Sequence, residues 1–160
     1  MLGFEYLPWL NFKVFTPAVS EALGKAALEA EAAGHKVVNP EHLFVSVLAS
    51  GKGSAAKILG KVAQQTQAVR DIISKDAIVE NKPPQTSKPY RGVEKKLSRP
   101  TKLVLRRAIK RARALSHYAV GTDHVMLALL EERAGRMAIV FDCLQLDPRQ
   151  CGEEIERALQ

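Results

Sequence analysis

The stretch Val37 to Leu48, VVNPEHLFVSVL, decides the fold because a similar stretch returns as Ala119 to Leu130, AVGTDHVMLALL. The two copies place their histidines, His42 and His124, 82 positions apart (124 − 42). Self-similarity at a fixed offset marks a repeated structural unit, so we expect two copies of one helical unit. The same offset aligns Thr16 with Ser98, Leu23 with Leu105, His35 with His117, Gly53 with Gly135 and Ala56 with Ala138.

Each copy carries the pattern of a helix start. Asn39 is a suitable N-cap, Pro40 fits the first helical position because its missing N–H would go unused, and Glu41 meets the positive end of the helix dipole. In the second copy, Gly121 takes the N-cap position and Asp123 the acidic position. A nearly continuous apolar run follows each start, which is typical of a helix that is buried on most sides. We expect these two helices to be central to their units.

The composition indicates an all-α protein with a substantial core. The chain has 160 residues, of which 46% are hydrophobic, and no strict alternation of polar and apolar residues predicts a series of strands. A chain of this length can bury one good core. Helices are expected at 17–33, 39–50, 54–59, 64–75, 99–115, 122–134, 137–144 and 148–159.

The domain boundaries follow from the repeat and from the prolines. Residues 1–14 form an apolar lead with little expected regular structure. The remainder of the chain divides into repeat one at 15–75, a connector at 76–97 and repeat two at 98–159. The connector contains NKPPQTSKPYRGVEKK, whose prolines and charges cannot hold a helix, so we expect it to be extended and solvated.

Several classes of function lack their motifs. Gly51 to Ser54, GKGS, lacks the upstream glycine of a phosphate-binding loop, and no nucleophile elbow occurs, so we expect no enzymatic activity from this chain and no cofactor. Cys143 and Cys151 have no Cys or His close in sequence, and each His pair is seven positions apart, so no metal site is expected. No apolar run reaches the length of a bilayer span and no signal peptide is evident, which predicts a cytoplasmic protein without a membrane partner, or a stromal one if a targeting segment was removed.

The doubled signature, a helix followed by VVNPEH or AVGTDH, aliphatic residues, glycine and a short helix, resembles the Clp-N repeat domain. That module lies at the amino terminus of Clp-family AAA+ unfoldases such as ClpA, ClpB and ClpC. The resemblance covers residues 15–159 and implies two pseudo-repeated four-helix units in one compact eight-helix bundle. It implies a module that recruits protein substrates or adaptors to a Clp AAA+ ring or Clp protease core. A free-standing accessory protein of the same fold, which modulates a Clp protease complex, is the alternative.

The resemblance also implies candidate site residues. In the ClpC branch the domain resembles a receptor for phosphoarginine, in which Glu41 and Asp123 would receive the guanidinium and Thr16 and Ser98 would be the neighbouring helix caps. A carboxylate pairs well with a guanidinium, and N–H groups at a helix start can accept a phosphate. Two alternatives stay open: a ClpB-like apolar groove for unfolded segments, and carboxylates that only stabilise helix starts.

The histidines have a structural interpretation. His42 and His124 are expected to be buried residues that form hydrogen bonds, because each stands at the third helical position beside an apolar run. His35 and His117 follow helix ends, where we expect them to satisfy carbonyl groups of the last turn.

The net charge of +7 comes from the second half of the chain. Residues 82–113 hold twelve Lys or Arg and one acidic residue, Glu94. One helix carries a surface that could bind an acidic partner, formed by Lys102, Arg106, Arg107, Lys110 and Arg111. Such a surface could also bind the phosphates of a nucleic acid, but only Tyr90 and Tyr118 lie nearby to stack on bases, so nucleic acid is the less favoured partner.

Overall fold

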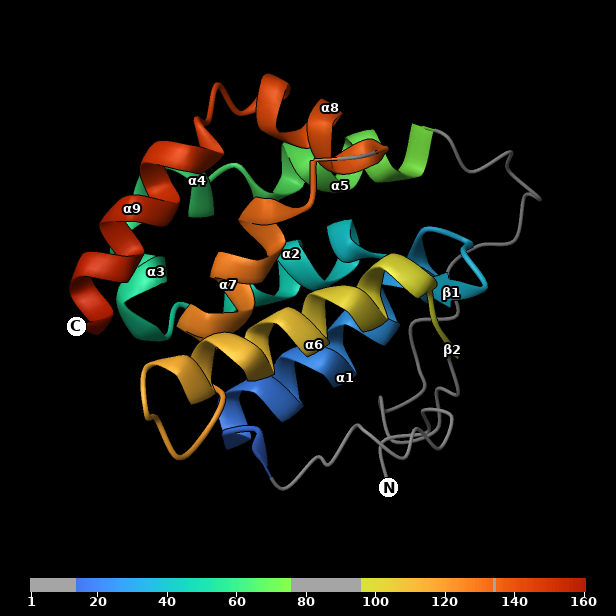
Figure 1. Ribbon diagram of the computed structural model, residues 1–160. Helices are drawn as coiled ribbons and strands as arrows, with labels where there is room; N and C mark the ends of the chain where they lie inside the picture. The colour runs from blue at the N-terminus through green and yellow to red at the C-terminus, as the bar shows by residue number, and fades with distance from the viewer. Residues whose placement is uncertain (1–13, 76–95, 134) are drawn as a thin grey trace.

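The computed structural model describes residues 14–75, 96–133 and 135–160, which form an all-α bundle as predicted (Figure 1). Repeat one contributes five helices: α1 (Pro17–Ala32), α2 (Pro40–Ser50), α3 (Gly53–Ile58), α4 (Gly60–Ala63) and α5 (Thr66–Lys75). Repeat two contributes four: α6 (Arg99–Ala114), α7 (Thr122–Glu131), α8 (Arg136–Cys143) and α9 (Pro148–Leu159). Two short strands, β1 (Val37–Val38) and β2 (Lys96–Leu97), complete the described elements.

The two central helices, α2 and α7, lie between the other layers. In Figure 1, α1 and α6 cover one side of this pair, while α5 and α8 lie on the opposite side. Helices of different repeats also contact each other, because α3 packs against α7 and α9, and α5 packs against α8. The two repeats therefore pack against each other in one bundle instead of forming two separate lobes.

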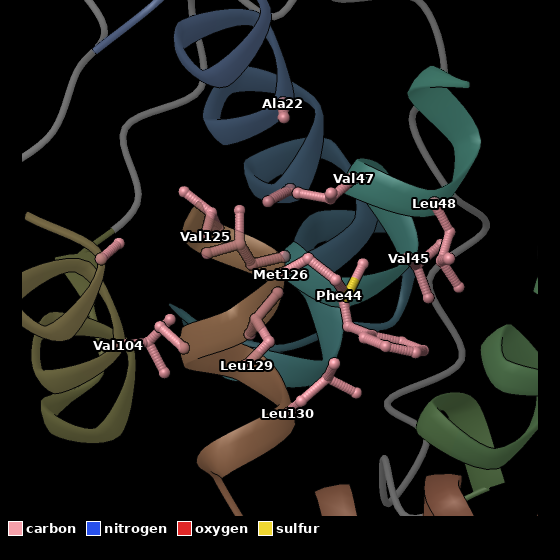
Figure 2. Packing of buried hydrophobic residues seen from close by; sticks show 14 of the residues in the cluster. Ala22, Phe44, Val45, Val47, Leu48, Val104, Val125, Met126, Leu129 and Leu130 are labelled. Atoms are coloured by element: carbon pink, nitrogen blue, oxygen red, sulfur yellow. The ribbon is translucent and has the colours of Figure 1, made fainter. Parts of the chain in front are cut away.

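The apolar runs of α2 and α7 lie at the centre of the shared core. Figure 2 shows Phe44 of α2 near Met126, Leu129 and Leu130 of α7, with Leu48 one turn further along α2. All five side chains are at most 2% exposed. Burial on nearly every side explains why both runs lack the polar stripe of a surface helix. The prediction that both helices are central is confirmed.

Backbone hydrogen bonds connect the start of each repeat to the signature of the other repeat. Strand β1 of repeat one pairs in parallel with β2, which leads into repeat two. The counterpart is a parallel bridge between Phe15 and Val120. In addition, the backbone N–H of Ser98 donates to the Val38 carbonyl (3.0 Å), and that of Thr16 donates to the Val120 carbonyl (3.0 Å). Each first helix is thus anchored beside the central helix of the other repeat.

The first helices begin and end as the sequence predicts. The Thr16 hydroxyl accepts from the Val19 N–H at the start of α1, and the Ser98 hydroxyl accepts from the Thr101 N–H at the start of α6. At the other end of α1, the backbone N–H of His35 donates to the Ala30 carbonyl after a left-handed Gly34. Helix α6 ends in the same way, with Ser116 as its left-handed residue and His117 as the donor.

Three expectations need correction. The third helix of repeat one breaks at Leu59, so α3 is followed by the separate α4 and the described residues hold nine helices instead of eight. The fourth helix begins at Thr66, two residues later than predicted. The connector was expected to be solvated through residue 97, but Leu97 lies in β2 and is 3% exposed because it pairs with the repeat-one strand. The expectations for 1–13 and 76–95 lie outside the described residues. No helix of the described part is long and apolar enough to cross a membrane.

Candidate functional site

A histidine pair connects the first and second helices of each repeat. His42 and His124 are buried, and the Nδ1 atom of each accepts from the backbone N–H of its N-cap residue, Asn39 (2.8 Å) or Gly121 (2.9 Å). Their Nε2 atoms bond to the Nδ1 atoms of His35 (2.9 Å) and His117 (2.8 Å). The buried hydrogen-bonding role of His42 and His124 is confirmed. The expectation that His35 and His117 satisfy helix-end carbonyls is confirmed through their backbone N–H groups, and their rings additionally pair with the second histidine.

These contacts indicate which ring nitrogen donates and which accepts in each pair. A ring nitrogen that accepts a backbone N–H carries no proton, so a neutral His42 or His124 carries its proton on Nε2 and donates it to the partner ring. The partner's Nδ1 must then be the acceptor. A second proton on either ring would place two N–H groups against each other, or would remove the hydrogen bond from the N-cap backbone N–H to Nδ1. This arrangement of hydrogen bonds therefore requires both rings of each pair to be neutral.

We expect acidification below about pH 6.5 to destabilise the fold. Burial lowers the pKa of His124, the neighbouring His117 lowers it further, and Asp123 partly opposes both effects. A histidine with a depressed pKa contributes stability above its unfolded pKa, and this stability is lost as the pH falls through the folded pKa. Urea unfolding at pH 7.5 and 5.5 should show a smaller unfolding free energy at the lower pH.

The variant His124→Gln provides the control for this prediction. It should be less stable than the wild type at pH 7.5 because its cap and ring pair are altered, but its loss of stability on acidification should be smaller. Glu41 titrates in the opposite sense, because burial raises its pKa, so the difference between the two proteins isolates the histidine contribution. Equal pH dependence in both proteins would contradict the neutral-pair interpretation.

The acidic residue of the second signature closes one junction between the repeats. The Asp123 carboxylate accepts from the backbone N–H groups of Ser54 (3.1 Å) and Ala55 (2.8 Å) at the start of α3. The Thr122 hydroxyl donates to the carbonyl of Lys52 (3.2 Å). A Cβ atom at Gly53 would lie 2.6 Å from an Asp123 oxygen, and its φ of +87° also favours glycine. These five residues and Asp123 form a closed junction. The ligand role predicted for Asp123 stays a prediction, but its carboxylate already has two partners within the chain.

The corresponding junction at Glu41 is an open pocket of about 460 Å³. It lies between the first signature and the start of α8, which is the repeat-two counterpart of the α3 start. Among the described residues, the Glu41 carboxylate accepts no hydrogen bond from α8, and Pro40 has no hydroxyl to match that of Thr122. The groups that matter for ligand chemistry in its lining are His35, Lys36, Glu41, Pro100, Glu132 and Arg136.

The electrostatics of Glu41 fit a cationic ligand. The side chain is 4% exposed, and burial raises its pKa, while its own backbone N–H and the charge of Arg136 lower it. A carboxylate that has lost its hydration on burial, without gaining a full ionic or hydrogen-bonding partner, is stabilised when a cation binds beside it. Lys36, Arg136 and the N-terminal end of α8 provide positive potential for an adjacent anionic group. The pocket can therefore hold a ligand that joins a cation to an anion.

The other predicted site residues divide between the two junctions. Ser98 lies beside the Glu41 signature and Thr16 beside the Asp123 signature, because their backbone N–H groups donate to the carbonyls of Val38 and Val120 in those signatures. Arg107 pairs with Glu132 (3.6 Å), and Arg111 pairs with Glu131 and Glu156. These two arginines are therefore neutralised within the chain, which narrows the acidic-partner surface predicted from the sequence.

Sequence reasoning missed Arg136 and Gly53. Arg136 lies next to the aligned Gly135, and its guanidinium donates to the Ile73 carbonyl of repeat one (3.1 Å). The alignment of Gly53 with Gly135 was the available signal, since it marks the helix starts that face the two signatures. The described residues hold no group of three metal-ligating side chains that could bind an ion.

Comparisons with known proteins agree with this arrangement. A family model, the Clp repeat (R) N-terminal domain, matches residues 14–144 and again 96–160. A chloroplastic ClpA homolog, CD4B, of Solanum lycopersicum is 30% identical over 156 residues, which are 97% of this chain and 16% of that protein. The chloroplastic chaperone protein ClpC1 of Oryza sativa is 31% identical over 147 residues, covering 91% of this chain and 15% of that protein. The chain thus spans only 15 to 16% of the length of these two relatives.

Solved structures have the same fold. The N-terminal domain of the chaperone ClpD from Arabidopsis thaliana superimposes with a TM-score of 0.72 at 18% identity, covering 96% of this chain and 99% of that one. The Hsp104 N-terminal domain from Candida albicans gives a TM-score of 0.69 at 18% identity, covering 91% and 93%. The duplicated signature, the cross-repeat packing and the family match lead to one conclusion: the chain belongs to the Clp repeat N-terminal domain family.

Proposed function

We propose that this chain is a protein-binding module that recruits polypeptide substrates or adaptors to a Clp AAA+ unfoldase. The observation that carries the proposal is the open junction, in which a nearly buried carboxylate lines a pocket between two repeats. Membership of the Clp repeat family and similarity to the amino-terminal parts of much longer Clp chaperones support it. In this proposal the ATPase lies in a ring to which the module delivers its ligand, and the chain itself performs no catalysis.

The Glu41 pocket is the proposed site for an arginine side chain that carries a phosphate. The guanidinium would pair with the Glu41 carboxylate, and the phosphate would meet Lys36, Arg136 and the N–H groups at the start of α8. Ser98 caps the neighbouring helix and holds the signature in place through Val38. Asp123 and Thr16 belong to the closed junction, so the proposal assigns the ligand to Glu41 and a structural role to Asp123.

The test is binding of a fluorescein-labelled unfolded polypeptide, with and without arginine phosphorylation, to the wild type and to Glu41→Gln. The phosphorylated polypeptide should bind more tightly to the wild type, and Glu41→Gln should weaken it by about tenfold or more, the effect of losing one charged pair. Circular dichroism would verify that the variant is folded. Equal binding of both polypeptides would overturn the phosphoarginine assignment, and tight binding unaffected by Glu41→Gln would place the recruiting surface elsewhere, as in an apolar groove.

The names of the relatives support a proposal for the cellular location. The names of both plant relatives describe them as chloroplastic. This supports the organelle stroma, which the sequence left as the alternative to the cytoplasm. A free-standing accessory role is the second form of the proposed function, and the length of the parent gene separates the two forms.

A further inference from the structure

The exposed ridge of α6 consists of Arg99, Leu103, Arg106, Lys110 and Arg113. At 3.6 residues per turn, these side chains lie within about 40° of one line along the helix, over a length of roughly 20 Å. Each is exposed, and Leu103 retains 40% of its accessible surface. Arg99, Lys110 and Arg113 form no ion pair with an acidic residue in the described ranges. The ridge is therefore basic with one apolar residue inside it.

Helix α1 of repeat one is the counterpart of α6, so a comparison of the two helices shows which residues the fold itself requires. The equivalent positions on α1 are Pro17, Glu21, Gly24, Leu28 and Glu31, none of which is basic. Because α1 forms a helix of the same length in the equivalent place, the fold does not require cations along this line. Like charges three and four residues apart also destabilise a helix slightly. Arg113 in the last turn suits the helix dipole, but Arg99 in the first turn opposes it, so the stability of α6 does not explain the ridge as a whole.

The cations that do stabilise the fold lie on another face of α6. Arg107 pairs with Glu132 just after α7, and Arg111 pairs with Glu131 of α7 and Glu156 of α9. Their positions are not part of the exposed ridge. Arg107 and Arg111 are thus neutralised within the chain, whereas Arg99, Lys110 and Arg113 of the ridge are exposed to solvent along α6.

We propose that the ridge docks an acidic, amphipathic segment of a partner protein, separately from the Glu41 pocket. Glutamates or aspartates spaced along such a segment complement Arg99, Lys110 and Arg113, and an apolar side chain covers Leu103. A protein segment fits this surface better than a nucleic acid does. The ridge offers an apolar contact at Leu103, one turn from its first residue, whereas Tyr118 is the one exposed aromatic residue near its end among the described residues.

The experiment uses two probes at 150 mM salt: a labelled amphipathic peptide with glutamates and leucines on one face, and a labelled 20-base-pair DNA duplex. The ridge variant is Lys110→Glu with Arg113→Glu. The matched control is Lys57→Glu with Lys61→Glu, which changes the net charge equally at exposed positions of repeat one. We expect the ridge variant to bind the peptide at least about tenfold more weakly and the control variant less than about threefold.

A third variant, Leu103→Ala, distinguishes a protein partner from a nucleic acid. It should weaken peptide binding about threefold, because part of an apolar contact is lost, and leave any duplex binding unchanged. Equal losses in the ridge and control variants would overturn the proposal in favour of diffuse net charge. Tighter binding of the duplex, lost in the ridge variant and insensitive to Leu103→Ala, would overturn it in favour of nucleic acid. No peptide binding by the wild type would also overturn it. None of these outcomes changes the function proposed for the Glu41 pocket.

Discussion

Replacing Phe44 by alanine should lower the free energy of unfolding by about 3–5 kcal/mol. Phe44 is fully buried on α2, and its ring meets that of Phe141 on α8 edge to face, with centroids 5.9 Å apart. The variant loses the burial of the ring, the aromatic contact and the close packing around both. Because Phe44 belongs to repeat one and Phe141 to repeat two, the loss weakens the junction of the repeats as well as one helix.

Urea unfolding followed by circular dichroism measures this effect. The wild type and Phe44→Ala should each unfold in one transition, since the core is shared. Ile139→Ala is the control, because Ile139 lies on α8 but is 47% exposed, and it should change stability by less than about 1 kcal/mol. Two separate transitions, with only one sensitive to Phe44→Ala, would show that the repeats fold independently and would contradict the single bundle.

Asp123→Asn should cost about 1–3 kcal/mol of stability, although the wild-type side chain stands in the position predicted for ligand binding. The carboxylate accepts from two backbone N–H groups, and an amide can accept from only one while its NH₂ group faces the other. Asp142→Asn, at an exposed position of α8, should stay within about 0.5 kcal/mol of the wild type. Thermal or urea unfolding at pH 7.5 gives both values.

Glu41→Gln should show the opposite behaviour. Since burial raises the pKa of Glu41, removing its charge should leave stability at pH 7.5 unchanged or increase it. Binding of the phosphorylated polypeptide should be lost in Glu41→Gln and retained in Asp123→Asn under conditions where the latter is folded. A stability loss in Glu41→Gln as large as that in Asp123→Asn would mean that both carboxylates are structural.

The repeat made much of the fold predictable. The offset between His42 and His124 located both central helices, and Thr16 and Ser98 marked the starts of the first helices. These signals are local, since a cap or an apolar run depends on neighbouring residues. The exchange between Val38 and Ser98 was not predictable in this way, because it joins residues that are far apart in the chain.

The difference between the two candidate sites was less predictable than the sites themselves. Aligned positions suggest equal roles for Glu41 and Asp123, and the shared acidic character supports that suggestion. The structure separates them because Thr122 supplies a hydroxyl where Pro40 has none, and because Asp123 reaches the start of α3. Such contacts depend on the placement of one repeat against the other, which neither signature encodes alone.

The most direct test of the account is calorimetric titration of the wild-type chain with phosphoarginine. The account predicts one binding site per chain, which disappears in Glu41→Gln and remains in Asp123→Asn. Two equivalent sites would contradict the division between an open and a closed junction. No measurable binding, or binding that survives Glu41→Gln, would contradict the assignment of this pocket as the recruiting site.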